Sequence, residues 1–277
     1  RLSYFFWRSM PDKALFDLAA AGSLESADDV AAQAKRLLAD EKAKTTIGSF
    51  FDEWLGLEEL PDRPKDAQVY PEFGEPLAHA MQEENRAFIN SVLFGGDGTF
   101  TSLMTGKGAS LSASVAPIYG ALSGAMSLDP AQRAGLMTRV GFLTVTGSPT
   151  GSHPVKRGRA VYERVLCGVL PPPPNNVPPA KPASDGGTTR QRFEEHDLNP
   201  CATGCHSLMD PLGFPFEHYD GIGRYRTMDN GLPVDSATKV NLDGATHQVA
   251  DALELSQLLA QSATAQGCFT AQWARFA

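Results

Sequence analysis

The stretch from residue 199 to residue 211 reads Asn-Pro-Cys-Ala-Thr-Gly-Cys-His-Ser-Leu-Met-Asp-Pro. Two cysteines, Cys201 and Cys205, stand four positions apart, and His206 follows at once. In the motif Cys-x-x-Cys-His, two thiols bond the vinyl groups of one haem and the imidazole reaches the iron. This stretch has one more residue between its cysteines. Because positions three apart and four apart both share a helix face, the longer spacing is compatible with the same chemistry.

Two other kinds of site use the same residue types. Cys201 and Cys205 could close a small disulfide loop in an exported protein. They could also bind zinc, with His206 as a third ligand and His196 or His218 as a fourth. The stretch alone leaves these alternatives open beside the haem site, since a motif is a hypothesis until its context supports it.

The sequence that follows the motif is rich in apolar and aromatic residues set among turn formers. Such a stretch can wall a large flat ligand, although an aromatic core beneath a loop explains the same composition. The candidate wall residues are Leu212, Phe214, Phe216 and Tyr219. Basic residues that could pair with haem propionates are Arg157, Arg224 and Arg226.

His206 is the predicted proximal iron ligand, because it is adjacent to Cys205. For the sixth position the sequence offers His196, at the end of a predicted helix, and Met228, downstream of the motif. Met209 lies only three residues from His206 and cannot reach the opposite face of a haem. An open or water-filled position is the alternative. The choice matters because the axial ligand sets the potential and decides whether the iron transfers electrons or binds a substrate.

The composition of the whole chain excludes several classes of function. A formal net charge of −8 argues against nonspecific nucleic-acid binding and against electrostatic docking on anionic lipid. No apolar run approaches the length of a membrane span. Neither a nucleophile elbow nor a Ser-His-Asp order appears, which argues against a hydrolase.

The four cysteines indicate the cellular compartment of the protein. If the motif claims Cys201 and Cys205, then Cys167 and Cys268 remain, and both stand at predicted helix ends in apolar stretches. We predict a disulfide between them, which suits a periplasmic, extracellular or cell-surface protein. The competing pattern is a Cys201–Cys205 disulfide with the other two cysteines as free buried thiols.

Apolar residues recur at helical spacing through most of the chain, so we predict a mainly α fold. Residues 1–128 form a multi-helix unit, in which one helix runs from Pro76 to about Phe94. Residues 129–245 form a second helical, loop-rich unit that contains the Cys-His segment. Residues 246–277 begin a C-terminal helical unit.

Within the second unit, a helix is predicted from Asp129 to Leu143. Four consecutive prolines then keep residues 171–179 extended as a polyproline strap. The turn signal Asp-Asn-Gly at 229–231 predicts at most a short hairpin, between residues 224 and 244.

Several stretches together resemble one known family. They are Arg-Leu-Ser-Tyr-Phe-Phe-Trp-Arg-Ser-Met-Pro-Asp at 1–12, the loop at 143–158, the proline strap, Arg-Phe-Glu-Glu-His at 192–196, the Cys-His motif, Met-Asp-Pro-Leu-Gly-Phe at 209–214 and Tyr-Asp-Gly-Ile-Gly-Arg-Tyr-Arg at 219–226. These stretches resemble the large exported bacterial proteins described as planctomycete-type cytochrome c proteins, which are assembled from consecutive domains of unknown function. The family's usual motif is Cys-x-x-Cys-His, from which this chain departs by one residue.

The resemblance covers nearly the whole chain and implies haem c. It also implies that the chain is an interior-to-C-terminal piece of a longer protein with further domains, but it leaves the reaction open. Our first hypothesis is a c-type haem module that exchanges electrons with a redox partner protein or a small-molecule carrier. The second is a haem enzyme with an open axial position, and the third is a non-redox binding or scaffold module with disulfide-bonded cysteines. We favour electron transfer, because no general acid or base is marked out near the predicted iron.

Overall fold

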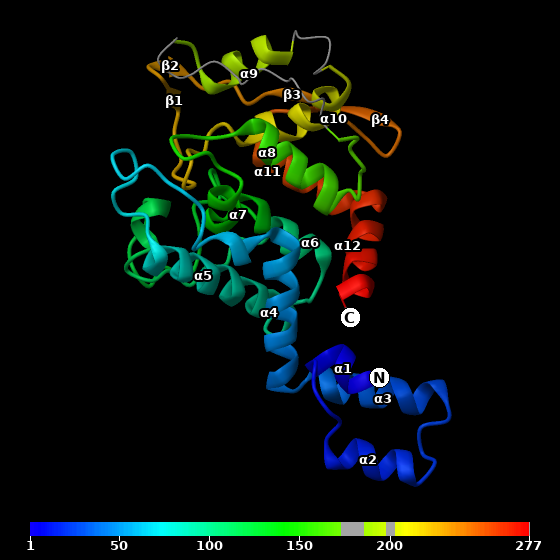
Figure 1. Cartoon of the computed structure of the whole chain (residues 1–277). Coiled ribbons are helices and arrows are strands. Elements are labelled where there is room, and N and C mark those ends of the chain that lie inside the picture. The colour runs from blue at the N-terminus through cyan, green and yellow to red at the C-terminus, as the bar shows by residue number, and fades with distance from the viewer. Residues whose placement is uncertain (173–185, 198–202, 277) are drawn as a thin grey trace.

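The structure, a computed structural model, describes residues 1–172, 186–197 and 203–276. Within these ranges it is mainly α, with twelve α-helices and two small two-stranded sheets, as predicted (Figure 1). The helices are α1 (Leu2–Trp7), α2 (Lys13–Ala20), α3 (Ala27–Leu38), α4 (Glu41–Leu55), α5 (Glu75–Leu93), α6 (Phe100–Thr105), α7 (Val140–Val145), α8 (Pro154–Ala160), α9 (Thr189–Asp197), α10 (Thr203–Gly213), α11 (Ala252–Gln261) and α12 (Ala263–Phe276). No helix in the described part of the chain is both long enough and apolar enough to cross a bilayer.

The first three helices form a small unit with a core of its own. Trp7, Leu15, Leu37 and Ala43 make up this core, and the indole Nε1 of Trp7 donates to the carbonyl oxygen of Leu37 at 2.9 Å. In Figure 1 the unit projects from the rest of the molecule, to which the long helix α4 connects it.

The remaining elements share one large hydrophobic core, which extends along the chain from Ile47 to Ala265. Helix α5 within it matches the helix predicted from Pro76 to about Phe94. This core draws on residues from all three predicted units, and the unit boundaries at 128 and 245 stay predictions from the sequence.

The helix predicted from Asp129 to Leu143 is wrong for most of its length. Residues 129–139 form turns and a short 3-10 segment, and α7 begins only at Val140. Gly135 explains part of the difference, because it has a φ of 60° and a Cβ there would lie 1.9 Å from the carbonyl oxygen of Met104. The buried Arg133 adds to it, since its guanidinium donates at 2.8 Å to the carbonyl oxygen of Thr138. The apolar spacing in this segment therefore reflects core contacts.

The strands form two hairpins where one was predicted. Strands β1 (Met228–Asp229) and β2 (Leu232–Pro233) pair across the predicted turn, and β3 (Thr238–Leu242) pairs with β4 (Ala245–Val249). The turn residues are Asn230-Gly231 and Asp243-Gly244, and all four have positive φ, as the type I′ turn requires. The Asp-Gly pair is the signal that would have placed the second hairpin.

The predicted disulfide is present. Cys167 and Cys268 are bonded, with their Cα atoms 5.5 Å apart and a sequence separation of 101. The bond joins the segment just after the π-helical turn Val161–Val165, which follows α8, to helix α12. Cys205 is a free thiol, whereas Cys201 and residues 173–185, which include most of the proline strap, lie outside the described residues.

Candidate functional site

Helix α10 carries the described part of the predicted haem segment, with Cys205 and His206 in its first turn. It packs on α8, and two glycines permit a close approach. A Cβ on Gly158 would lie 1.9 Å from the carbonyl oxygen of Met209, and one on Gly213 would lie 2.0 Å from the carbonyl oxygen of Pro154. The two helices therefore meet backbone against backbone, which fixes where α10 and its histidine lie.

A Gly158→Ala substitution is expected to destabilise the protein by about 1–3 kcal/mol, because the new methyl group forces α8 and α10 apart. Gly204→Ala is the matched control, since a Cβ at Gly204, in the first turn of α10, meets nothing within 4 Å. Urea unfolding of both variants measures the difference. Equal midpoints for the two variants would contradict the close packing.

His206 is held by a carboxylate one turn further along α10. Its Nδ1 lies 2.9 Å from Oδ2 of Asp210, and the side chains of the two residues are 12% and 3% exposed. An ionised carboxylate only accepts hydrogen bonds, so Nδ1 is the donor in this contact. A metal-binding histidine is commonly oriented in this way, with a carboxylate behind the imidazole.

A second histidine, His153, begins α8 and is electrically neutral. Its Nδ1 accepts the backbone N–H of Lys156, and its ring packs against Phe193 of α9 with 4.9 Å between centroids. Burial lowers the pKa of His153 to about 3, helped by the charges of Lys156 and Arg157 and by the neighbouring His206. With Nδ1 as acceptor the proton lies on Nε2, so this imidazole has no lone pair left for a metal.

The predicted wall residues are all buried. Leu212, Phe216 and Tyr219 belong to the main core, where the ring of Phe216 lies 6.1 Å from that of Phe142. The remaining wall residue, Phe214, is 6% exposed and lies beneath the guanidinium of Arg190. Such burial is what core packing requires, and a role beside a haem stays a prediction.

The predicted propionate partners are engaged within the protein. Arg157 is fully buried and donates to the carbonyl oxygens of Phe216 at 2.8 Å, Tyr219 at 2.7 Å and Asp220 at 2.5 Å. Burial lowers the pKa of Arg157 to about 10, so it stays charged at neutral pH. Its guanidinium thus organises the segment that follows α10.

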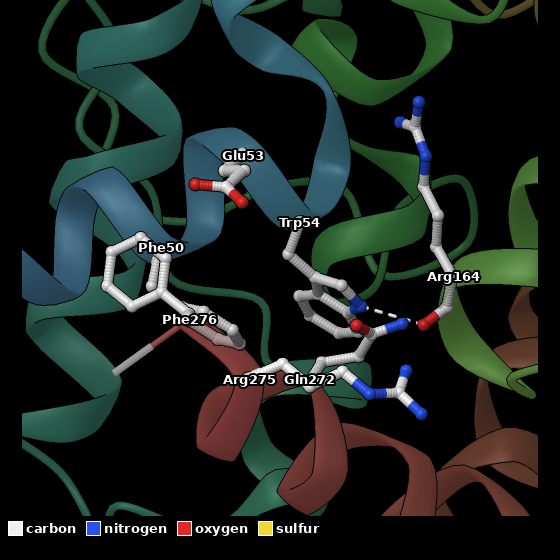
Figure 2. Close-up of a pocket in the computed structure, with 7 residues that line it drawn as sticks. All are labelled: Phe50, Glu53, Trp54, Arg164, Gln272, Arg275 and Phe276. Carbon is white, nitrogen blue, oxygen red and sulfur yellow. Dashed lines mark hydrogen bonds between the residues drawn. The ribbon is translucent and has the colours of Figure 1, made fainter.

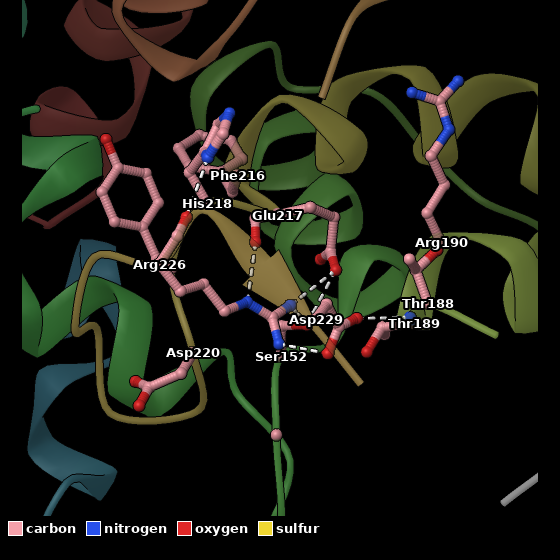
Figure 3. Close-up of polar contacts among 12 residues, drawn as sticks. Ser152, Thr188, Thr189, Arg190, Phe216, Glu217, His218, Asp220, Arg226 and Asp229 are labelled. Atoms are coloured by element: carbon pink, nitrogen blue, oxygen red, sulfur yellow. Dashed lines mark hydrogen bonds and ion pairs between the residues drawn. The ribbon is translucent and has the colours of Figure 1, made fainter. Parts of the chain in front are cut away.

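Arg224 and Arg226 are also paired. Arg224 is partly exposed and forms an ion pair with Glu72. Arg226 donates to Glu217 Oε2 at 3.1 Å and to Asp229 Oδ1 at 2.5 Å (Figure 3). Glu217 is fully buried; this burial raises its pKa, while Arg157 and Arg226 oppose the rise.

The Arg226 network reaches the helix that leads into the Cys-His segment. Its Nη2 donates to Ser152 Oγ at 2.9 Å, and Ser152 Oγ donates to Glu217 at 2.8 Å. On the other side, Asp229 Oδ2 accepts the backbone N–H of Thr189 at 2.5 Å, at the first residue of α9 (Figure 3). The start of α9 is therefore tied to the segment after α10.

The proposed sixth ligands lie on different elements. His196 belongs to α9, and its side chain is not among those described. Met228 lies on β1 and is 50% exposed. His218, the alternative zinc ligand, bonds the carbonyl oxygen of Arg226 through Nδ1 at 2.9 Å and stacks on Tyr225. The described residues contain no group of three or more His, Cys, Asp and Glu side chains arranged for a metal.

Asp210 was not singled out by the sequence analysis. The signal is a histidine and an aspartate four positions apart in a predicted helical stretch, a spacing that brings two side chains together on one face. The Cys-His motif identifies the candidate ligands, and it contains no signal for the Asp210 carboxylate that contacts one of them.

Among the cavities in the described part of the molecule, two lie beside α12. One, of about 200 Å³, lies between α4, Arg164 and α12 (Figure 2). Its lining residues are Phe50, Glu53, Trp54, Arg164, Gln272, Arg275 and Phe276. The other, of about 660 Å³, is a mainly apolar cleft lined by residues that include Leu38, Phe94 and Trp273. Neither of these two cavities is lined by a residue of α10.

Comparison with known families agrees with the motifs. Residues 1–121 match the model of PSD4, a protein of unknown function (DUF1592), and residues 133–229 match that of PSCyt3, a protein of unknown function (DUF1588). No curated protein and no solved structure matches the chain. The second match contains the α8–α10 pair with His206 and Asp210. The chain thus carries two consecutive domains, of the DUF1592 and DUF1588 families, which match the description of the planctomycete-type cytochrome c proteins that its motifs resemble.

Proposed function

We propose that the Cys-His segment attaches a c-type haem and that the chain is an electron-transfer module of a larger exported redox protein. The observation that carries the proposal is the orientation of His206. Its Nδ1 lies 2.9 Å from Oδ2 of the buried Asp210, so Nε2 is the ring nitrogen that would bind the iron. The free thiol of Cys205 is the preceding residue on the same helix.

The donor set fits the group. Cys201 and Cys205 would form the thioethers, and His206 would bind the iron through Nε2. His196 and Met228 remain the candidates for the sixth position. When bound, the haem supplies one-electron chemistry at its iron.

The packing of the chain supports the same proposal. Close contact of Gly158 and Gly213 with the facing helix holds α10 rigidly, and the network from Arg226 through Asp229 to Thr189 holds the start of α9. Both helices that flank the attachment segment are therefore anchored, which suits a site whose ligand geometry must not change between oxidation states.

The location and the partners are part of the proposal. A disulfide that closes a loop of about a hundred residues persists in an oxidising compartment, so we place the module in the periplasm or at the cell surface. Its partner would be a redox protein or a small-molecule electron carrier, alongside further domains of the same longer chain. A haem enzyme with an open sixth position would bind added cyanide or azide rapidly. An electron-transfer haem whose sixth position is filled by a protein side chain would not.

His206→Ala tests the ligand assignment. In protein made in the periplasm with a haem-attachment system, the variant is expected to keep its thioethers and to lose the reduced low-spin spectrum, because the iron loses its axial imidazole. His79→Ala is the control, since His79 lies on α5 with its side chain 54% exposed. An unchanged reduced spectrum in His206→Ala would refute the assignment.

A further inference from the structure

We propose that Asp210 is a positioning residue that acts through His206 to favour the ferric state of the iron. The inference rests on the proposed function and deepens it, because it says what sets the potential of that site. Asp210 would contact neither the iron nor the porphyrin. Its effect passes through one hydrogen bond to the imidazole.

The hydrogen bond from His206 to Asp210 fixes the orientation of the imidazole ring. Oδ2 lies 2.9 Å from Nδ1 of His206, and both residues belong to the same helix, one turn apart. Helix α10 is fixed in place on both sides of Asp210. Met209 and Gly213 both lie in close backbone contact with α8. The imidazole plane is therefore set by the backbone of α10 together with the carboxylate.

Burial strengthens the electrostatic effect of an ionised Asp210 on the imidazole of His206. Its side chain is 3% exposed, so water does little to screen the carboxylate from the imidazole beside it. A carboxylate that accepts the Nδ1 proton raises the basicity of the ligand and increases donation from Nε2. The neighbouring His153 is neutral and adds no positive charge to the pair.

The direction of the effect follows from the charge on the iron. The ferric form carries one more positive charge than the ferrous form, so a more strongly donating imidazole and a nearby negative charge both favour it. An ionised Asp210 would therefore make one-electron reduction of a bound haem iron less favourable. The midpoint potential should therefore be lower with Asp210 than with a neutral residue of similar shape.

Asp210→Asn is the test, since an amide oxygen still accepts the Nδ1 proton but carries no charge. The holoprotein is expected to keep its covalent haem and its axial histidine, as judged by mass and visible spectrum, and its midpoint potential should become more positive. Asp210→Glu restores the charge and should return the potential toward that of the wild type. A purely structural role would change stability and leave the potential where it was.

Asp52→Asn is the matched control. Asp52 is also 3% exposed and is paired with Arg86, which lies on α5. Its replacement removes a buried carboxylate remote from α10 and should leave the potential unchanged. If the Asp210→Asn protein cannot be produced, Asp210→Ser replaces it. Serine is smaller and neutral, and the midpoint potential of this variant should also become more positive.

The outcomes separate this inference from the proposed function. A potential equal to that of the wild type in Asp210→Asn, with haem attached and the spectrum intact, overturns the role of Asp210 and leaves the haem site standing. Equal shifts in Asp210→Asn and Asp52→Asn also overturn it, because the effect would then come from any lost buried charge. A wild-type protein without covalent haem overturns the proposed function and this inference with it.

Discussion

An Arg157→Met variant is expected to lose about 3–5 kcal/mol of folding free energy, a large part of the stability of an ordinary domain. Methionine fills much of the space of the arginine stem and donates no hydrogen bond. The carbonyl oxygens of Phe216, Tyr219 and Asp220 would each lose a buried donor. A buried carbonyl left without a donor costs about 1–3 kcal/mol, and this cost falls chiefly on Tyr219, because the carbonyl oxygens of Phe216 and Asp220 keep the backbone N–H groups of Tyr219 and Gly223.

The charge balance adds to this loss. Glu217 is fully buried, and its Oε1 lies 4.0 Å from Nη1 of Arg157. Without Arg157, this carboxylate keeps Arg226 as its charged partner. A buried charge that loses part of its compensation is destabilising by a few kcal/mol.

Arg159→Met is the control for this experiment, because it removes the same side chain from the same helix. Arg159 is 63% exposed and pairs with Glu163 four residues along, an interaction worth a few tenths of a kcal/mol. Soluble yield and urea unfolding, followed by circular dichroism, compare the two variants. Equal midpoints would mean that Arg157 does not hold the segment after α10.

The disulfide carries the second large effect. In the loop-entropy description, a bond that closes a loop of about a hundred residues stabilises the folded state by roughly 4–5 kcal/mol. The double variant Cys167→Ala/Cys268→Ala is therefore expected to unfold at a much lower urea concentration than the wild type. Cys268 is 5% exposed and packs in α12, so alanine there also removes some apolar contact.

Cys205→Ala serves as the control, because this cysteine is a partly exposed free thiol. The apoprotein with this change should unfold like the wild type. Added reductant should lower the midpoint of the wild type toward that of the double variant and leave the double variant unmoved. A wild type that is insensitive to reductant would contradict the expected stabilisation.

Local signals in the sequence were sufficient for much of the fold. Ser26 and Asp29 form the capping box that opens α3, and Asn230-Gly231 forms the turn of the first hairpin. Both devices act within four residues, so they can be identified without knowledge of the tertiary structure. The Cys167–Cys268 bond followed from counting, because the motif had already claimed the other two cysteines.

Long-range contacts explain what could not be predicted. Arg133 and Arg157 look like surface residues in the sequence, yet both are buried and bind carbonyl groups far away in the chain. Gly135 has a positive φ and leaves no room for a Cβ beside the backbone of Met104, thirty-one positions earlier. Periodicity reports which face of a segment is apolar, and it carries no information about which distant carbonyl a buried arginine will meet.

In the candidate site, too, some residues could be predicted from the sequence and others could not. His206 and Cys205 could be named from the motif, since adjacency in sequence is part of the chemistry. Asp210 needed the structure, because many helical i,i+4 pairs are solvent-exposed and only burial makes this one significant. The wall residue Phe216 was named for its composition, and its place in the main core depends on packing against α7.

The mass of the intact protein, made in the periplasm with a haem-attachment system, decides whether a haem is covalently bound. We expect a mass increased by one haem that survives denaturation, with the bands of a reduced c-type haem in the visible spectrum. Cys201→Ser and Cys205→Ser should each remove one thioether. A protein of unmodified mass, colourless and with Cys201 bonded to Cys205, would contradict the haem site and support the scaffold hypothesis.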